Sequence, residues 1–286
     1  MFVIIGYVVI LAAVFGGFAM AGGHLGSLVQ PIELLMIGGA AGGAFFVGNN
    51  GKVVKATLKA LPTVLKGSKF NKALYLDLLS LLFEVLAKVR KEGLMSIEGD
   101  VENPESSPIF SKYPKIISDH HVVEFMTDYL RLMVGGNLNS MEIENLMDVE
   151  LETHHTEGHV APGAVAKLAD GLPAFGIVAA VMGVVHTMES VGIPPAGLGK
   201  LIAAALVGTF LGILLSYGFV GPLAGLLEQK LDESSKMFQC IKVTLLASLN
   251  GYAPQVAVEF GRKVLYSTER PTFKELEDEV KSRKGK

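Results

Sequence analysis

Tryptophan is absent from this chain of 286 residues, and cysteine occurs once, at Cys240. A single cysteine excludes an internal disulfide framework. The formal net charge is only −3, and no basic stripe typical of a nucleic-acid-binding surface is present. The sequence also lacks a phosphate-binding glycine loop and a nucleophile elbow. These absences argue against an enzyme and against a nucleic-acid partner.

Charged residues are almost missing from four long apolar runs. The runs are residues 1–21, 31–48, 172–188 and 201–227. Each approaches or exceeds the ~20 residues that a helix needs to cross a bilayer. A chain of 30.4 kDa is too small to bury all four in one water-soluble core. The sequence therefore predicts an all-α polytopic membrane protein with four transmembrane helices in two hairpins and a helical cytoplasmic domain inserted between them.

The expected segments follow the apolar runs along the chain. They are transmembrane hairpin 1 at 1–49, the cytoplasmic helical domain at 50–170, transmembrane hairpin 2 at 171–228, and cytoplasmic C-terminal helices with a tail at 229–286. In the inserted domain, Asn71 is expected to cap a helix with one apolar face, and Gly93 to end it. Residues 122–133 and 140–155 fit two further helices, the second capped by Asn139 or Ser140.

Lysine and arginine set the expected orientation. Residues 1–51 contain neither, whereas residues 52–72 contain six lysines and the segment after 228 is rich in both types. The positive-inside rule therefore predicts cytoplasmic termini and a cytoplasmic middle domain. Ala19-Met20-Ala21 is similar to a signal-peptide cleavage site, but no basic segment precedes the first run, so a retained helix is expected.

Small residues recur at helical spacing in two of the runs. Gly38 and Gly42, with Gly39 and Gly43, form two small-xxx-small pairs that are expected to close the first hairpin. On the last span, Ala204, Gly208, Gly212 and Ser216 recur every fourth residue and give one small face. The sequence leaves open whether that face packs or slides.

Two prolines lie near the cytoplasmic ends of the second hairpin's helices. Pro173 is expected to begin its helix, and Pro222 to interrupt the hydrogen bonding of a helix that continues past Lys230.

Ionisable residues are missing at mid-membrane depth. Glu33 is expected near the outer end of its helix, where it stays solvated. His186 is the only titratable side chain inside a span, and a packing role is favoured over proton relay. If the chain takes part in ion flow, the carboxylate that carries the ion must therefore come from another chain.

The middle of the chain contains a histidine group and an isolated pair of charges. His154, His155 and His159 favour a solvated helix end over a metal site, because no further ligand is identifiable. Arg90 and Glu98 flank the Gly93 turn. The structural interpretation is that Arg90 complements the dipole at the end of its helix and that Glu98 caps a short turn. The functional interpretation is that both are exposed charges that contact a partner. Sequence physics alone favours the first.

Four runs carry a resemblance to a known family over essentially the whole chain. They are GNNGKVVKATLKALP (48–62), DGLPAFGIVAAVMGVVH (170–186), GTFLGILLSYGF (208–219) and SLNGYAPQVAVEFGRKVLYSTERP (248–271). With the two-hairpin layout, they resemble the MotA family of flagellar motor stators, in the MotA/TolQ/ExbB proton channel superfamily. The resemblance implies a proton-driven torque generator in the bacterial inner membrane. It implies a ring, understood as a pentamer, around a dimer of MotB.

The resemblance also assigns roles. MotB supplies the ion-binding aspartate and the peptidoglycan anchor, and the transported ion is a proton, without a cofactor. Arg90 and Glu98 match the charges that contact the rotor protein FliG. Pro173 and Pro222 match the family's coupling prolines, and Thr209 matches a position of the ion path. Sodium-type relatives carry threonine where this chain has Ala180, which implies proton use.

Two alternatives stay open. An energiser of the ExbB/TolQ type also transfers proton-motive force, but to envelope transport. A scaffold without ion coupling would tolerate Pro173→Ala and Pro222→Ala. The four-span layout and the context of the two prolines favour the stator.

Overall fold

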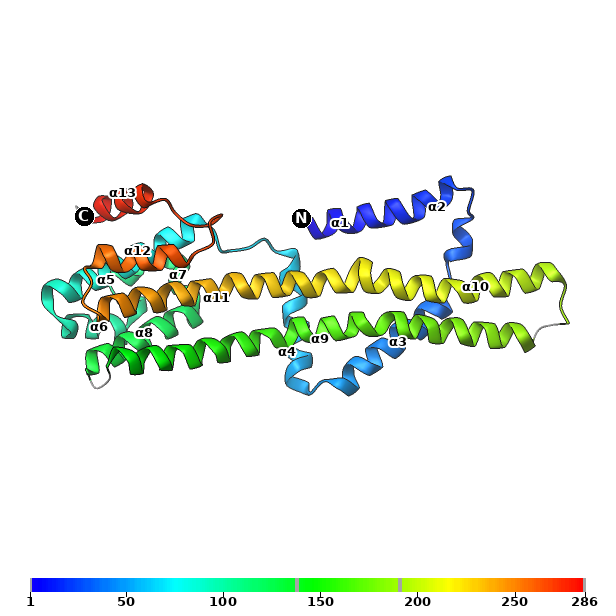
Figure 1. Cartoon of the computed structure of the whole chain (residues 1–286), viewed down its shortest axis with the longest axis horizontal. Coiled ribbons are helices and arrows are strands. Elements are labelled where there is room, and N and C mark those ends of the chain that lie inside the picture. The colour runs from blue at the N-terminus through cyan, green and yellow to red at the C-terminus, as the bar shows by residue number, and fades with distance from the viewer. Residues whose placement is uncertain (1, 137–138, 190–191, 285–286) are drawn as a thin grey trace. The chain divides into compact units, whose positions relative to one another are not determined.

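Helices form all the regular secondary structure of residues 2–136, 139–189 and 192–284, which are the residues that the computed structural model describes (Figure 1). The α-helices are α1 (Phe2–Leu11), α2 (Gly17–Met20), α3 (Pro31–Gly48), α4 (Gly51–Ala60), α5 (Lys72–Glu92), α6 (Glu98–Glu102), α7 (Pro114–Ile117), α8 (His120–Gly135), α9 (Ser140–Glu189), α10 (Pro195–Ile213), α11 (Gly221–Leu249), α12 (Pro254–Val264) and α13 (Phe273–Lys284). Two π-helical segments, Ala12–Gly16 and Leu214–Val220, join α1 to α2 and α10 to α11.

Within the part of the chain that the structure describes, four helical stretches are long and apolar enough to cross a membrane. They are Phe2–Met20, Leu25–Gly48, and one window within each of Ser140–Glu189 and Pro195–Leu249. The predicted all-α class with four transmembrane helices is thereby confirmed. Residues 140–155 and 172–188 were expected as separate helices, but both belong to the single 50-residue helix α9.

Pro173 lies inside α9 and does not begin it, so that expectation is wrong. A proline removes one backbone donor and costs about 3 kcal/mol in a helix interior. The buried contacts that α9 makes on both sides of Pro173, through Ala169, Leu172 and Gly176, outweigh that cost. Pro222 behaves as expected. It is the second residue of α11, directly after the π-helical segment, and the helix continues to Leu249.

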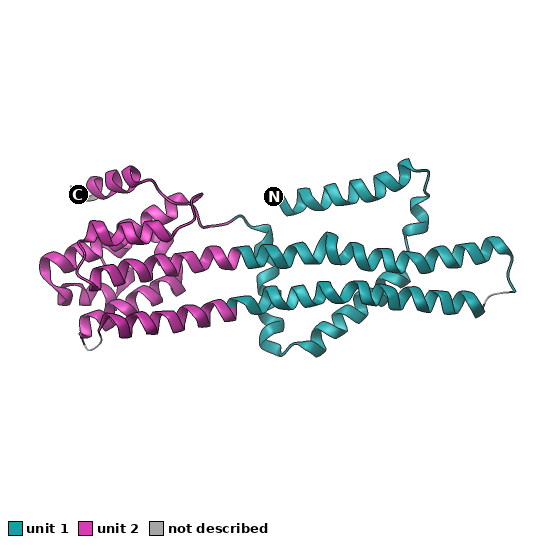
Figure 2. Ribbon diagram, viewed as in Figure 1, with its two compact units in different colours: residues 1–67, 158–229 teal, residues 68–157, 230–286 magenta. Residues whose placement is uncertain are grey.

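The chain divides into two compact units, each built from two separate stretches of sequence (Figure 2). Unit 1 comprises residues 1–67 and 158–229, and unit 2 comprises residues 68–157 and 230–286. The long helices α9 and α11 each contribute one part to unit 1 and the other part to unit 2.

Unit 2 is organised around α5. Asn71 caps this helix as predicted, since its Oδ1 accepts a hydrogen bond from the Leu74 amide at 3.0 Å. Gly93 ends the helix with φ +86°, a conformation that favours glycine. The buried surface of α5 is wider than the single apolar face that was expected, because Tyr75, Leu79 and Phe83 are buried as well. Helix α5 is therefore covered on most of its circumference and is the centre of the unit's core.

Unit 1 is held together by close backbone approach between α9 and α10. A Cβ atom built on Gly212 would lie 2.7 Å from the Leu172 carbonyl oxygen and 2.8 Å from Gly176 Cα. A Cβ on Gly183 would lie 2.8 Å from the Ala205 Cβ. The small face of the last span is thus a packing surface within the chain, at least at Gly208 and Gly212, which answers the question that the sequence left open.

Helix α1 packs on the π-helical segment Leu214–Val220 and on the 3₁₀ segment Leu61–Leu65, whereas α3 packs on α10. The Tyr7 hydroxyl donates a hydrogen bond to the Phe219 carbonyl oxygen at 3.0 Å. On α3, Ile37 and Ala41 are buried in a cluster with residues of α9.

The glycine pairs of α3 do not close the first hairpin, so that expectation is wrong. Cβ atoms on Gly38, Gly39, Gly42 and Gly43 would have no described atom within 4 Å beyond their own helix. The buried face of α3 carries Glu33, Ile37 and Ala41 instead, at i, i+4 and i+8. This face of α3 packs against neighbouring helices, and the four glycines lie outside the contact.

Candidate functional site

Arg90 and Glu98 lie on either side of a short 3₁₀ turn, Leu94–Ile97, in unit 2. Arg90 is in the last turn of α5 and Glu98 is the first residue of α6. Both side chains are exposed, and neither forms an ion pair with any residue in the described ranges. No side chain caps α6 at its first turn. The structure therefore presents two unneutralised charges of opposite sign at one turn, beside an exposed Met95.

A buried polar group fixes this turn. Asp100, on α6, is 5 % exposed. Its carboxylate accepts a hydrogen bond from Lys88 Nζ at 2.7 Å and another from Ser107 Oγ at 2.6 Å. Charge-assisted bonds of this kind are stronger than neutral ones. They tie α6 to α5 and so hold Glu98 in place relative to Arg90.

Ala180 and Thr209 come together in unit 1, where α3, α9 and α10 meet. A Cβ atom on Gly208, the residue before Thr209, would lie 3.2 Å from the Ala180 backbone nitrogen. The same atom would lie 3.3 Å from Ala179 Cβ. Both Ala180 and Thr209 are half-buried. The two positions predicted for the ion path thus lie on adjacent, closely packed helices.

Glu33 also belongs to this junction, and sequence reasoning placed it wrongly. It was expected in a solvated position, but it is 7 % exposed. A Cβ on Gly208 would lie 2.9 Å from its Oε2. Gly208 is 13 residues from the Pro195 end of α10, or roughly 20 Å along the helix. The position of Glu33 along α3 does not by itself reveal that the side chain is buried, because the α9–α10 hairpin extends well beyond the first turn of α3. The spacing of Glu33 with Ile37 and Ala41 was the available signal.

Pro173 and Pro222 lie on neighbouring segments of unit 1. A Cβ on Gly221, directly before Pro222, would lie 4.0 Å from Ala169 Cβ, one helical turn before Pro173. Pro222 has no backbone N–H, so one hydrogen bond of its helix is missing. The π-helical segment before it also shifts the backbone hydrogen bonds from the α-helical to the π-helical spacing. The two prolines thus lie close together in unit 1, one inside the continuous helix α9 and the other directly after a π-helical segment.

The three histidines do not lie at a helix end as expected, because α9 continues through them. His154 packs its ring 4.5 Å from the ring of Phe238, and burial lowers its pKa. His155 lies 3.7 Å from Asp232 and His159 lies 4.0 Å from Glu228. Within the described ranges, no three histidine, cysteine or acidic residues are arranged to hold a metal. His186 is exposed on α9.

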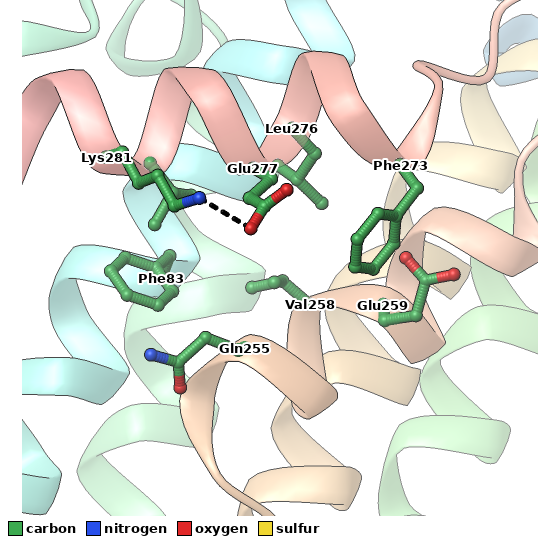
Figure 3. Close-up of a pocket in the computed structure, with 9 residues that line it drawn as sticks. Phe83, Gln255, Val258, Glu259, Phe273, Leu276, Glu277 and Lys281 are labelled. Carbon is green, nitrogen blue, oxygen red and sulfur yellow. Dashed lines mark hydrogen bonds and ion pairs between the residues drawn. The ribbon is translucent and has the colours of Figure 1, made fainter.

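One cavity of 280 Å³ lies in unit 2 between α5, α12 and α13 (Figure 3). Phe83, Val258 and Phe273 are among its apolar lining residues, and the Lys281–Glu277 ion pair, at 2.6 Å, is part of the α13 side. None of the candidate site residues lines it. The cavity therefore marks an incomplete contact of the C-terminal helix with the core, separate from the positions considered above.

Comparison with known proteins gives two family matches and several close relatives. Residues 4–93 match the motility protein A N-terminal family, and residues 118–240 match the MotA/TolQ/ExbB proton channel family. The chain is 58 % identical to motility protein A of Escherichia coli over all of this chain and 97 % of that one. It is 57 % identical to the Salmonella typhimurium protein, covering 99 % and 96 %. Identity to the chemotaxis protein LafT of Vibrio parahaemolyticus is 36 %, covering 98 % and 99 %.

Solved structures agree on the fold. A structure of C. jejuni MotAB matches with a TM-score of 0.77 at 20 % identity, covering 94 % of this chain and 98 % of that one. The flagellar MotAB stator complex from Bacillus subtilis matches with a TM-score of 0.73 at 22 % identity, covering 90 % and 92 %.

Proposed function

The chain belongs to the motility protein A group of the MotA/TolQ/ExbB proton channel family, and from this we propose that it is a stator subunit of a bacterial flagellar motor. In this role it converts proton-motive force into torque on the rotor. The observation that carries the proposal is the identity of 57 to 58 % to two motility proteins over nearly their full length.

MotB is the proposed membrane partner. Two of the matching structures are of MotAB complexes, which supports a complex of the same composition here. We assign the ion-binding aspartate and the peptidoglycan anchor to MotB. Ala180 and Thr209 of this chain would line the path at the junction of α9 and α10. The methyl side chain of Ala180 offers no oxygen to a metal cation, which favours a proton over sodium. No cofactor or catalytic reaction is required.

The rotor protein FliG is the proposed partner of Arg90 and Glu98. Both charges are exposed and unneutralised within the described ranges, and the bonds of Asp100 hold their turn in place. Exposed charges give specificity and orientation to an interface more than affinity. They therefore suit a contact that forms and breaks repeatedly as the rotor turns.

The proposed assembly is a pentameric ring of this chain around a MotB dimer. It lies in the bacterial inner membrane, in contact with lipid, with both termini of this chain in the cytoplasm. The six lysines between residues 52 and 72 support this orientation.

Pro173 and Pro222 are proposed to couple ion passage to motion of the cytoplasmic part. Each lacks a backbone donor, so the helices can bend there at a lower cost than elsewhere. An energiser of the ExbB/TolQ type is the second candidate, because the match over residues 118–240 includes that group. The match of residues 4–93 to a motility protein family favours the stator.

The test is complementation of a strain that lacks this gene and its MotB partner. Flagellar rotation and proton uptake are measured with this chain alone, MotB alone, and both chains. We expect rotation and uptake only with both, and loss of rotation with Pro173→Ala or Pro222→Ala at normal membrane level. Uptake by this chain alone would contradict the shared path, and rotation unaffected by both proline variants would support a scaffold. Normal rotation in the deletion strain would refute the stator role.

A further inference from the structure

A carboxyl group buried on the packing face of a membrane helix is left unused by the proposed function. Glu33 is 7 % exposed, and its Oε2 has no hydrogen-bond partner among the described residues. Removing a charged carboxylate from water costs several kcal/mol unless partners compensate. Ionisable side chains inside membrane segments are accordingly rare and usually functional. A leucine or glutamine would fill the same space at a lower cost, so packing alone does not account for Glu33.

The surroundings leave room for the carboxyl group. Gly208 faces Oε2 across the α3–α10 contact, and any Cβ at that position would lie 2.9 Å from this oxygen. The Ala179 methyl group and the Ala180 backbone nitrogen border the same space from α9. Glu33 therefore lies where Ala180 meets Gly208, the residue before Thr209, and Ala180 and Thr209 are the positions proposed to line the ion path.

The helices around Glu33 carry few other ionisable groups. Near the connection between α9 and α10, the ionisable residues are His186 and Glu189 on α9 and Lys200 on α10. His24 precedes α3. None of them bonds to Glu33 Oε2. Since no described residue donates a hydrogen bond to it, this oxygen is available to bind a proton.

We infer that Glu33 is a proton-binding group of this chain and passes protons between the outer side and the junction at Ala180 and Thr209. This inference rests on the proposed function. In the loading step an O–H bond forms on Glu33 with a proton from hydronium, leaving water, and the neutral acid suits the buried position. In the release step that O–H bond breaks and the proton moves to water or to the MotB carboxylate. The charge returns to Glu33 and is ready for the next proton.

The experiment uses the full chain with MotB in the deletion strain. Glu33→Gln keeps the size of the side chain and removes titration, whereas Glu33→Asp keeps titration. Glu189→Gln, an exposed carboxylate at the end of α9, is the matched control. Rotation speed at low load is recorded over a series of external pH values at constant membrane potential, together with membrane level and co-purification of MotB.

We expect Glu33→Gln to lower the low-load speed at least threefold and to flatten its dependence on external pH. Glu33→Asp should keep a pH-dependent speed, with a shifted midpoint, and Glu189→Gln should match the parent. A parental speed and pH profile for Glu33→Gln overturns the inference. Slow rotation in both variants with the parental pH profile assigns Glu33 to packing and also overturns it.

Two further outcomes are separated by the controls. If Glu33→Gln does not accumulate in the membrane, Glu33→Asp decides, and an unshifted pH profile overturns the inference. If the unmodified chain with MotB restores no rotation, the proposed function fails, and the inference fails with it. If the unmodified chain with MotB restores normal rotation, a negative result for the Glu33 variants concerns only the inference about Glu33.

Discussion

The two units of this chain achieve stability by different means. Unit 2 buries a continuous set of large side chains around α5, among them Leu78, Leu82 and Tyr75, each 0 % exposed. Unit 1 buries few large side chains and instead brings the backbones of α9 and α10 together at Gly176 and Gly212. Its large apolar residues face outward, as lipid-facing side chains do.

This difference follows from the solvent of each unit. In water, burial of apolar surface is the main driving force, so large side chains belong inside. In lipid that force between helices is absent, and close backbone contact replaces it. A loss of side-chain volume should therefore harm unit 2 most, and a gain of volume should harm unit 1 most.

Leu82→Ala tests the first half of this comparison and should have the largest effect. The side chain is fully buried in α5, so truncation leaves a cavity and should lower the free energy of unfolding by about 2 to 5 kcal/mol. Urea unfolding of the purified chain in detergent, with amide hydrogen exchange to locate the loss in α5, measures it. Leu58→Ala is the control, because Leu58 is 61 % exposed. Equal losses for the two variants would contradict the core described for unit 2.

Gly176→Ala tests the second half. The added Cβ would lie 2.8 Å from the Gly208 carbonyl oxygen and 3.0 Å from Gly212 Cα, and backbone atoms cannot move aside cheaply. Overpacking of this kind should cost roughly 1 to 3 kcal/mol.

Gly163→Ala is the matched control on the same helix. Its Cβ would meet no atom within 4 Å, so higher helix propensity should raise stability, by up to about 1 kcal/mol. Thermal unfolding of the purified complex compares the two variants. Destabilisation by both, to the same extent, would show that the loss comes from something other than the α9–α10 contact.

Local patterns predicted much of this fold because they depend on neighbouring residues. The cap at Asn71, the end at Gly93 and the bounds of α3 all follow from residues within a few positions, and the structure confirms them. The continuity of α9 was missed. Pro162 and Pro173 are local signals for an end, and tertiary contacts outweigh them.

The site was less predictable, since it depends on how helices align. Glu33 lies in the first turn of α3, and that position alone indicates solvent. Its contact with Gly208 depends on how far α10 extends past α3, which neither sequence segment encodes by itself. By contrast, the exposure of Arg90 and Glu98 follows from their place at two helix ends around a glycine turn. Their interpretation as helix-end charges did not anticipate that neither pairs with an opposite charge among the described residues.

Glu259→Gln should give the smallest effect and shows where unit 2 depends on charge. Hydrogen bonds from Arg262 hold the pKa of Glu259 below its ordinary value, and Arg262 itself is 6 % exposed. A lowered folded-state pKa means that the carboxylate stabilises the fold above the ordinary glutamate pKa. This stability is lost as the pH falls through the folded-state value. At neutral pH the variant should lose about 1 to 2 kcal/mol.

The pH dependence distinguishes this charge from the apolar core. The difference in unfolding free energy between the parent and Glu259→Gln should stay constant from pH 7 down to the ordinary glutamate pKa. It should shrink as the pH falls below that value toward the lowered folded-state pKa, because the parent then loses the same charge. Urea titrations of the purified chain at a series of pH values measure that difference. Glu105→Gln, at an exposed position, should stay within about 0.5 kcal/mol of the parent. A difference for Glu259→Gln that does not change with pH would mean that shape, and not charge, holds Arg262. Unit 2 would then resemble unit 1 in depending on fit alone at this contact.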